Sequence, residues 1–453
     1  MKLSPPLCCF LPALLSLAAP PLVEAESMPP QVFEKSLTVQ DDLDTISAAG
    51  DGAGGVIFST HSTLARLSPL GLEKWVRTIP GSGGVITIGS SGDIYGAGTT
   101  VFKFSAEGEL AWSKTPGGVL TTIVTDDQGG IYAAGATAGA KDLYLVKYDA
   151  EGNLQWTRQF GGSAGLDDLA TGLVAVPGGG VVVTGLTRNP AESFITIRYS
   201  ASGTATWISY YDAPGKVESA PASIVRLSDG KFLVAGKSGS EAVAVKYTAG
   251  GTEERVRPLP EVYQLATGPS GDAVALTALP QITNPAWTPL GEAPQYVWPF
   301  YLVHIPADGA VSWSAALGNA ERRSTVQLIR LPDGGCLSSF GSAERNGSRD
   351  ARLVSVNANG TDLSESRLPQ FLSMSFGPVV NRALTTSPDG GIWAIYRSES
   401  SNKLKVRRYG TTPPSAAPVA MTAGFDEVQP AGARLKGTVN PGGAQTTWHF
   451  EYD

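Results

Sequence analysis

The sequence predicts an all-β protein: an eight-bladed β-propeller of four-stranded antiparallel blades, closed by the N-terminal strand and followed by a partial β-sandwich module. One phrase recurs along the chain, and a second phrase precedes each copy of it. The chain also holds 54 Gly and 32 Pro residues but only 17% charged residues. This composition is typical of many short strands joined by tight turns, and no segment has the pattern of a long amphipathic helix.

The recurring phrase predicts the two outer strands of each blade. It is written "KFSAEGELAWSKTPGG" from Lys103 and "YDAEGNLQWTRQFGG" from Tyr148. Its Trp residues follow one another at intervals of 37, 44 and 51 residues, at Trp75, Trp112, Trp156 and Trp207. A period of about 40 to 50 residues is typical of propeller blades.

The second phrase predicts the inner strands, and its copies give the number of blades. They are "GGVIFST" from residue 54, "SGDIYGAG" from 91, "GGIYAAG" from 129, "GGVVVTG" from 179, "DGKFLVAG" from 229, "SGDAVALT" from 270, "GGCLSSF" from 334 and "GGIWAIY" from 390. We expect eight blades over residues 30–412. Seven remain possible if one degenerate unit is misread.

The eighth unit lacks a last strand of its own, and the N-terminal segment "QVFEKSLTV" from Gln31 supplies one. Its "FEKSL" matches "WSKTP" and "WTRQF", which places Phe33 where other units hold Trp. We therefore expect the first strand of the chain to close the ring and leave no open edge beside the last unit.

The N-terminus has the layout of a secretory signal peptide over residues 1–25, with an apolar stretch from Leu7 to Ala19 and small residues at Val23 and Ala25. We expect an exported protein, whether secreted, at the cell surface or periplasmic, with no transmembrane segment in the mature chain. Cleavage would leave Cys336 as the single cysteine. It replaces an aliphatic residue of the second phrase, so we expect a buried, inert thiol.

A Pro-rich linker is predicted at residues 413–418, and a second module at residues 419–453. There "GTVNPGG" turns one strand into the next and "WHFEYD" begins another. The segment resembles the opening of a fibronectin type III-like or immunoglobulin-like module. Because only about three strands fit and a sandwich needs more, we expect a partial module.

The stretch "DLYLVKYDAEGNLQWTRQFGGSAGLDDLATGLVAVPGGGVVVTGLT", from Asp142 to Thr187, resembles the bacterial β-propeller repeat called SBBP. That family's pattern runs from an aliphatic-Lys-aromatic strand through a Trp strand to a "G-aliphatic-x-x-TG" strand. The resemblance implies a secreted or surface bacterial protein. It implies no family-wide catalytic residues.

A row of basic residues recurs on the third strand of the units. Two readings are open: a ring of cations around the channel that attracts an anion, or aliphatic stems that cover apolar surface while their charged ends reach water or a carboxylate. We favour the second. The basic members are Arg66, Lys103, Lys147, Arg198, Lys246 and Arg408, with His304 and Ser355 at the other two positions.

The remaining chemistry-bearing residues exclude several function classes. The net charge of −7 is spread without basic blocks, which argues against nucleic acid as a partner. The three histidines are scattered, so "GGSAG" at Gly161 lacks the histidine that a nucleophile elbow needs. We expect no catalytic residues, no metal site and no cofactor.

Connection lengths point to a binding face. The four strands of each unit are called A to D in chain order. The A-to-B and C-to-D turns are short and uniform, whereas the B-to-C and D-to-A connections vary and emerge on the opposite side, where variable loops carry function. The sixth unit has a long aromatic insertion on that side. The insertion either binds a ligand or folds over its own blade as a cap. The candidate ligand-binding residues are Trp287, Tyr296, Trp298, Tyr210, Tyr211, Asp212, Arg322 and Arg323.

We therefore expect an exported, non-catalytic binding or scaffolding propeller, a monomer that holds a glycan or protein ligand at the cell surface. Two alternatives stay open. Pyrroloquinoline quinone dehydrogenases also have eight blades, with repeats that resemble "DAEGNLQW", although many carry a vicinal disulfide that this mature chain cannot form. The other alternative is an envelope assembly scaffold of the same propeller type.

Overall fold

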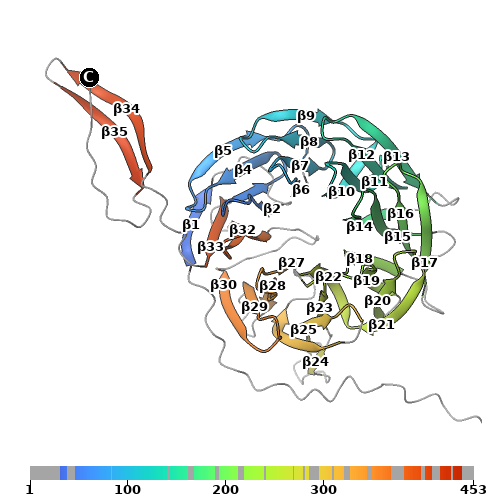
Figure 1. Cartoon of the computed structure of the whole chain (residues 1–453). Coiled ribbons are helices and arrows are strands. Elements are labelled where there is room, and N and C mark those ends of the chain that lie inside the picture. The colour runs from blue at the N-terminus through green and yellow to red at the C-terminus, as the bar shows by residue number, and fades with distance from the viewer. Residues whose placement is uncertain are drawn as a thin grey trace, which may run out of the picture.

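The computed structural model arranges the chain as a ring of eight antiparallel sheets (Figure 1). In each blade the first strand, A, lies at the centre of the ring and the fourth strand, D, at its rim. The structure describes residues 31–37, 46–82, 84–139, 142–161, 168–188, 193–212, 219–238, 241–268, 270–278, 281–284, 295–308, 311–320, 327–343, 349–368, 382–398, 403–410, 419–429 and 432–440. The predicted leader at residues 1–25 and linker at residues 413–418 lie outside these ranges.

In blades one to four, the four strands lie side by side in the order in which they occur in the chain. Blade one is β2 to β5 (Ser47–Gly50, Val56–Ser59, Thr63–Leu67, Glu73–Thr78). Blade two is β6 to β9 (Val85–Ile88, Ile94–Ala97, Val101–Phe104, Leu110–Lys114). Blade three is β10 to β13 (Gly118–Thr125, Ile131–Thr137, Leu143–Tyr148, Leu154–Phe160). Blade four is β14 to β17 (Leu169–Ala175, Val181–Thr187, Ser193–Tyr199, Ala205–Tyr211).

Blades five to eight repeat the pattern with two changes. Blade five is β18 to β21 (Ser219–Arg226, Phe232–Ser238, Glu241–Tyr247, Glu253–Leu259). Blade six is β22, β23, β25 and β26 (Glu261–Thr267, Ala273–Ala278, Gln295–Ile305, Trp313–Ala320), and its B-to-C insertion adds β24 (Gln281–Asn284) beside β25. Blade seven is β27 to β30 (Gln327–Arg330, Cys336–Ala343, Arg349–Val356, Leu363–Leu368). Blade eight is β31 to β33 (Arg382–Thr386, Ile392–Ser398, Lys403–Tyr409) with β1 (Gln31–Leu37).

The ring closes through β1, as the sequence predicts, and the blades number eight rather than seven. β1 pairs antiparallel with β33, and Phe33 stands opposite Arg408 just as Trp156 stands opposite Lys147 in blade three. The Phe33 ring packs edge-on against Trp393 at 5.5 Å between centroids. Closure therefore joins the two ends of the propeller within one sheet and removes an unpaired edge.

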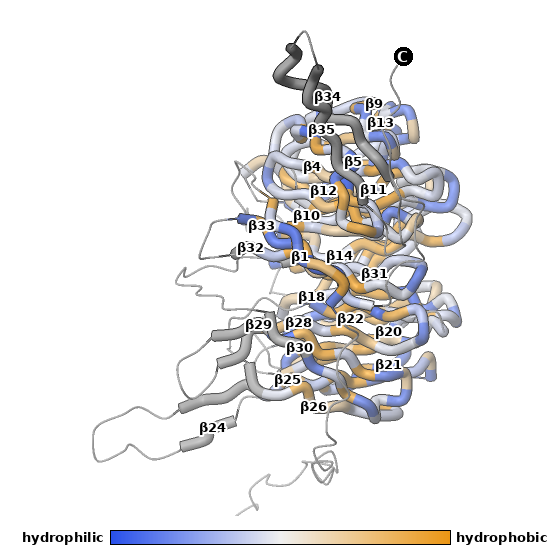
Figure 2. The backbone as a smooth tube through the Cα atoms, turned by 90° about the vertical axis from the view of Figure 1, so that its left-hand side faces the viewer, coloured by the Kyte–Doolittle hydropathy of each residue, from blue (hydrophilic) through white to orange (hydrophobic). Residues whose placement is uncertain are grey.

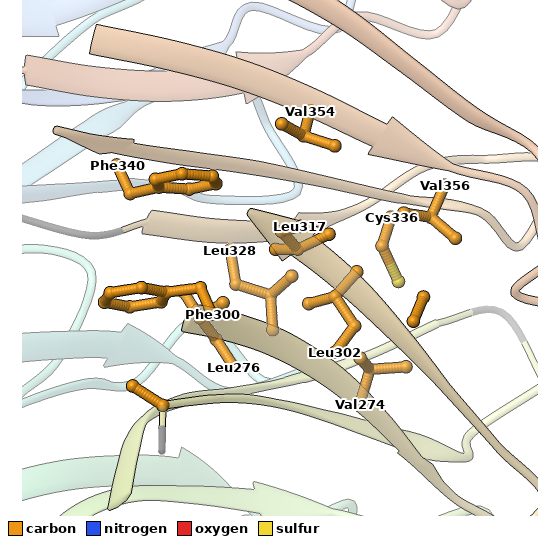
Figure 3. Close-up of a cluster of buried hydrophobic side chains, with 12 residues drawn as sticks. Val274, Leu276, Phe300, Leu302, Leu317, Leu328, Cys336, Phe340, Val354 and Val356 are labelled. Atoms are coloured by element: carbon orange, nitrogen blue, oxygen red, sulfur yellow. The ribbon is translucent and has the colours of Figure 1, made fainter. Parts of the chain in front are cut away.

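The core lies between neighbouring blades, where inward-facing apolar side chains from two sheets meet. Figure 2 shows hydrophobic stretches within the strands and hydrophilic residues at many of the turns. The cluster between blades six and seven includes Cys336, which is fully buried as expected and whose pKa is raised by burial. Figure 3 shows its labelled neighbours, which are Val274, Leu276, Phe300, Leu302, Leu317, Leu328, Phe340, Val354 and Val356.

After the ring, β34 (Val419–Gln429) and β35 (Gly432–Asn440) pair with each other in a two-stranded antiparallel sheet. Two strands alone are too few for a sandwich. Residues 441–453, which hold "WHFEYD", lie outside the described residues.

Candidate functional site

The topology gives the ring two different faces. In each meander the A-to-B and C-to-D turns emerge on one side, here called the turn face, and the B-to-C and D-to-A connections on the other, here called the loop face. On the turn face the same contacts recur from blade to blade.

On the turn face a Trp from one blade packs on a Gly of the next blade. Gly152 has a φ of +81°, and a Cβ at this position would lie 2.7 Å from Cδ2 of Trp112. The Trp112 indole Nε1 donates a hydrogen bond to the carbonyl oxygen of Ala150 in the same C-to-D turn, at 3.1 Å. The pairs that repeat this contact are Trp75 with Gly108, Trp156 with Gly203, Trp207 with Gly251 and Trp313 with Gly360.

The basic residue on the C strand reaches the same carbonyl. Lys103 Nζ lies 3.3 Å from the Ala150 oxygen and 3.0 Å from the Asp93 carboxylate in the A-to-B turn of its own blade. Arg66 makes the equivalent contacts with Ala106, at 2.7 Å, and Asp51, at 2.9 Å. Lys147 and Lys246 have both kinds of contact, whereas Arg198 donates to the Ala249 carbonyl oxygen of the next blade and Arg408 pairs with Asp389 of its own blade. Each of the six described cations is thus held by a carboxylate, by the next blade or by both, which confirms the structural interpretation of this row.

We call this arrangement the clasp: a D-strand ring and a C-strand cation from one blade, and the C-to-D turn carbonyl and Gly of the next. Phe33 supplies the ring where blade eight meets blade one, and it covers Gly71, whose Cβ would lie 2.4 Å away. The clasp changes in three places. Arg255 replaces the ring in blade five, His304 replaces the cation in blade six, and Ser355 and Ser364 replace both in blade seven.

The blade-six variant places three polar side chains in a row. His304 contacts Asp272 through Nε2 and Ser312 through Nδ1, and its ring stacks on Trp313 at 5.1 Å. Burial raises the pKa of Asp272, but the hydrogen bond from His304 and the charge of Arg330 lower it below its ordinary value. His304 and Asp272 stand where blade two has Lys103 and Asp93. We therefore assign Asp272, His304 and Ser312 to the clasp rather than to catalysis.

On the loop face, the predicted site residues of blade four separate. Tyr210 is 53% exposed, while Tyr211 is buried and packs against Phe194 at 5.6 Å. Asp212 is exposed and accepts a hydrogen bond from the Ser219 hydroxyl at 3.4 Å. The Phe160 ring lies 6.4 Å from Tyr210. An aromatic surface at this rim therefore contains Tyr210 but not Tyr211.

The other candidate residues are described only in part. Tyr296 and Trp298 lie on β25, where their backbones pair with Ile282 and Ala320. Trp287, Arg322 and Arg323 lie outside the described residues. The aromatic insertion of blade six stays a prediction.

Sequence reasoning missed two apolar residues at the loop-face end of the channel. Val119 is 51% exposed and Leu169 is 39% exposed. Each stands near the start of an A strand, where the register breaks between Leu120 and Thr122 and between Ala170 and Gly172. Their exposure could have been predicted from the sequence, because both residues stand at the start of the innermost strand, which faces the channel (Figure 1).

The described ranges contain no group of three or more His, Cys, Asp and Glu side chains placed to hold a metal. None of their segments forms a helix long and apolar enough to cross a membrane.

These features define a closed β-propeller with a repeated turn face and a variable loop face. No family model matches the sequence, and no curated protein matches it. The fold is similar to that of BamB from Moraxella catarrhalis, with 12% identity, 84% of this chain and 100% of that chain covered, and a TM-score of 0.54. The Dos1 propeller is 10% identical over 84% of this chain and 95% of that one, with a TM-score of 0.49. Identities this low show a shared fold alone.

Proposed function

We propose that this chain is a non-catalytic binding or scaffolding propeller that holds its partner, a protein or a glycan, over the loop face. The observation that supports this most is the contrast between the two faces. On the turn face the clasp uses the cations, carboxylates and rings to join neighbouring blades. On the loop face the exposed Tyr210, Val119 and Leu169 stand beside connections of varied length, whereas the exposed Leu110 and Leu154 of the turn face stand beside short, uniform turns.

The kind of partner follows from the side chains. A rigid tyrosine ring beside a carboxylate, here Tyr210 and Asp212, suits either a sugar ring or a polypeptide. The aliphatic Val119 and Leu169 at the channel mouth match apolar side chains and offer a glycan no hydrogen bond. We therefore propose a protein partner first, and a glycan is the alternative outcome of the test.

The test compares matched variants of the two faces. Tyr210→Ala with Leu169→Ser should lose partner retention from cell-surface extract, and Leu110→Ser with Leu154→Ser should keep it. Leu110 and Leu154 are 49% and 56% exposed at the opposite, turn-face end of D strands. Retained proteins are identified by mass spectrometry, glycans on an array, and folding by circular dichroism. Equal retention by both double variants would refute the loop-face site.

The blade-six insertion gives a second arm of the same test. Trp287→Ala with Trp298→Ala should abolish retention and leave the fold intact if the insertion belongs to the binding surface. Normal retention by this variant would assign the insertion to capping its own blade.

We also propose that the chain is an exported bacterial protein of the SBBP type, with a fibronectin type III-like module begun at residues 419–453. The leader-like segment at residues 1–25 and the repeat from Asp142 to Thr187 support this. N-terminal sequencing of the protein from a bacterial culture checks export, since cleavage is expected near Ala25. A chain that keeps Met1 would contradict it.

A further inference from the structure

The clasp ring normally lies in a slot between two side chains. Trp112 lies between Tyr95 of its own blade and Tyr148 of the next, at 6.3 and 6.0 Å between ring centroids. Trp156 lies in the same way between Tyr132 and Tyr199, at 5.8 and 6.0 Å. The walls of the slot therefore belong to the B strand of one blade and the end of the C strand of the next.

Between blades five and six the slot is present but its ring is missing. Arg255 takes the ring position, because it stands opposite Lys246 as Trp156 stands opposite Lys147. Leu233, opposite Lys246, has the position of Tyr95 opposite Lys103. A cavity of about 10 Å³, lined by Leu233, Ile305 and the stems of Lys246, Arg255 and Arg257, marks the vacated slot.

The cation of the clasp and its contact with the next blade are kept here. Lys246 is 5% exposed, and its Nζ donates to the carbonyl oxygen of Ala307 in the C-to-D turn of blade six. The same Nζ pairs with Asp229 at 3.3 Å and Glu254 at 3.4 Å. The two blades thus meet in the usual way, and the empty slot is a local feature rather than a sign of a degenerate blade.

Within the described residues, Arg257 makes neither of the contacts that its counterparts make. In blade three the equivalent Arg158 donates from Nε to the carbonyl oxygen of Gly203 at 2.6 Å, and its guanidinium lies 5.3 Å from the Trp156 ring centroid. Arg77 does the same in blade one. Arg257 Nε is buried and, within the described part of the chain, has no hydrogen-bond acceptor. A buried donor without an acceptor raises the free energy of the folded state.

We propose that this slot binds a small aromatic carboxylate. The ring takes the place of the missing indole between Leu233 and Ile305 with Arg257 over its face, and the carboxylate accepts hydrogen bonds from Arg255 and Arg257. Arg255 is exposed and swings outward to admit the ring, since the cavity as it stands has room for about one water. This site lies toward the turn face and is independent of the proposed loop-face function.

The charges around the slot favour an anion. Lys231 and Lys246 are both paired with Asp229 and Glu254. Within the described residues, neither Arg255 nor Arg257 forms an ion pair, so two guanidinium groups remain for the ligand. A neutral ring gains only the apolar contacts and the cation–π contact.

The first experiment titrates the purified full chain with indole-3-acetate and with neutral indole, by calorimetry. Saturable 1:1 binding is expected, with indole weaker. Arg257→Gln should weaken indole-3-acetate about tenfold, as loss of a charge-assisted hydrogen bond does. Arg158→Gln, the matched change in blade three, should leave binding unchanged. No saturable binding of indole-3-acetate to the native chain would overturn the proposal.

The second experiment fills the slot from within. Arg255→Trp restores the clasp ring and should abolish binding of both probes, with Arg255→Phe as the smaller replacement if the Trp variant does not fold. Arg255→Ala leaves the slot open and should still bind indole while losing affinity for the acid. A folded Arg255→Trp variant that binds indole-3-acetate as the native chain does would place the ligand elsewhere and overturn the proposal.

Discussion

At the scale of single residues, the clasp glycine is required for two independent reasons. Gly152 has a φ of +81°, where side chains are disfavoured, and its α-carbon lies against the Trp112 indole. Gly52 has a similar φ of +75° but no atom within 4 Å of where a Cβ would be. The two glycines therefore separate backbone strain from steric contact.

Gly52→Ala should destabilise the protein by about 1 to 2 kcal/mol through backbone strain alone. Gly152→Ala should cost about 1 to 3 kcal/mol more, because the methyl group displaces the indole from its slot. Urea unfolding of the two variants measures the difference. Equal losses would show that the indole moves away freely and that its contact with Gly152 is loose.

Trp156 tests the ring itself. It is 8% exposed, lies between two tyrosine rings and donates to the Ala201 carbonyl at 3.0 Å. Trp156→Ala should lower the free energy of unfolding by about 3 to 5 kcal/mol. Trp156→Phe should cost only about 1 kcal/mol, because Lys147 Nζ still donates to that carbonyl and Phe33 shows that a ring without an N–H fits the clasp. An Ala variant as stable as the Phe variant would contradict inter-blade packing.

At the scale of elements, β1 and β33 show what the sequence could predict. The match of "FEKSL" to "WTRQF" placed Phe33 correctly. Segments that match in sequence pair with the neighbouring strand in the same register, so their residues have equivalent partners. The different exposure of Tyr210 and Tyr211 follows from strand geometry and could be predicted from the sequence. Neighbours on a strand point to opposite faces, so only one of them could be exposed. The carbonyl of Ala201 and the register breaks beside Val119 and Leu169 could not be predicted, since backbone groups and bulges leave no residue signature.

Glu34 links closure of the ring to pH. It accepts hydrogen bonds from Lys405 at 2.7 Å and Tyr396 at 3.1 Å, and pairs with Arg407. Burial raises the pKa of Glu34, but Lys405 and Arg407 lower it below its usual range. Because the folded pKa lies below the unfolded value of about 4.3, Glu34 stabilises the ring above that pH. This stabilisation is lost as the pH falls through the folded pKa.

Glu34→Gln should therefore lower the melting temperature at pH 7, and the difference from the native chain should shrink towards pH 3. Glu109→Gln is the matched control, since Glu109 is 79% exposed in its pair with Arg77 and such pairs contribute little. Melting curves across this range measure both. A Glu34→Gln penalty that is the same at pH 3 and pH 7 would exclude the carboxylate as its source.

At the scale of the whole molecule, a clasp ring joins six of the eight pairs of neighbouring blades, the pair of blades five and six keeps the clasp cation without a ring, and the pair of blades seven and eight has neither. Blade eight has no C-to-D turn, because its C strand is β33 and its D strand is the N-terminal β1. Blade seven, which faces it, carries Ser355 and Ser364 where the cation and ring stand elsewhere. The clasp side chains and the turn that would receive them are absent together, and the described residues of this junction meet in an apolar cluster that includes Leu337, Leu384 and Ile392.

The same substitution should therefore act differently at the two junctions that lack a clasp ring. Arg255→Trp should raise the free energy of unfolding by about 1 to 3 kcal/mol, since its indole enters an existing slot and its Nε1 donates a hydrogen bond to the Ala307 carbonyl oxygen. Ser364→Trp should give no gain, because no turn of blade eight receives the ring. Urea unfolding compares the variants, and hydrogen exchange locates the change at β21 or β30. A gain at Ser364 equal to that at Arg255 would show that the ring alone, without the turn of the next blade, holds two blades together.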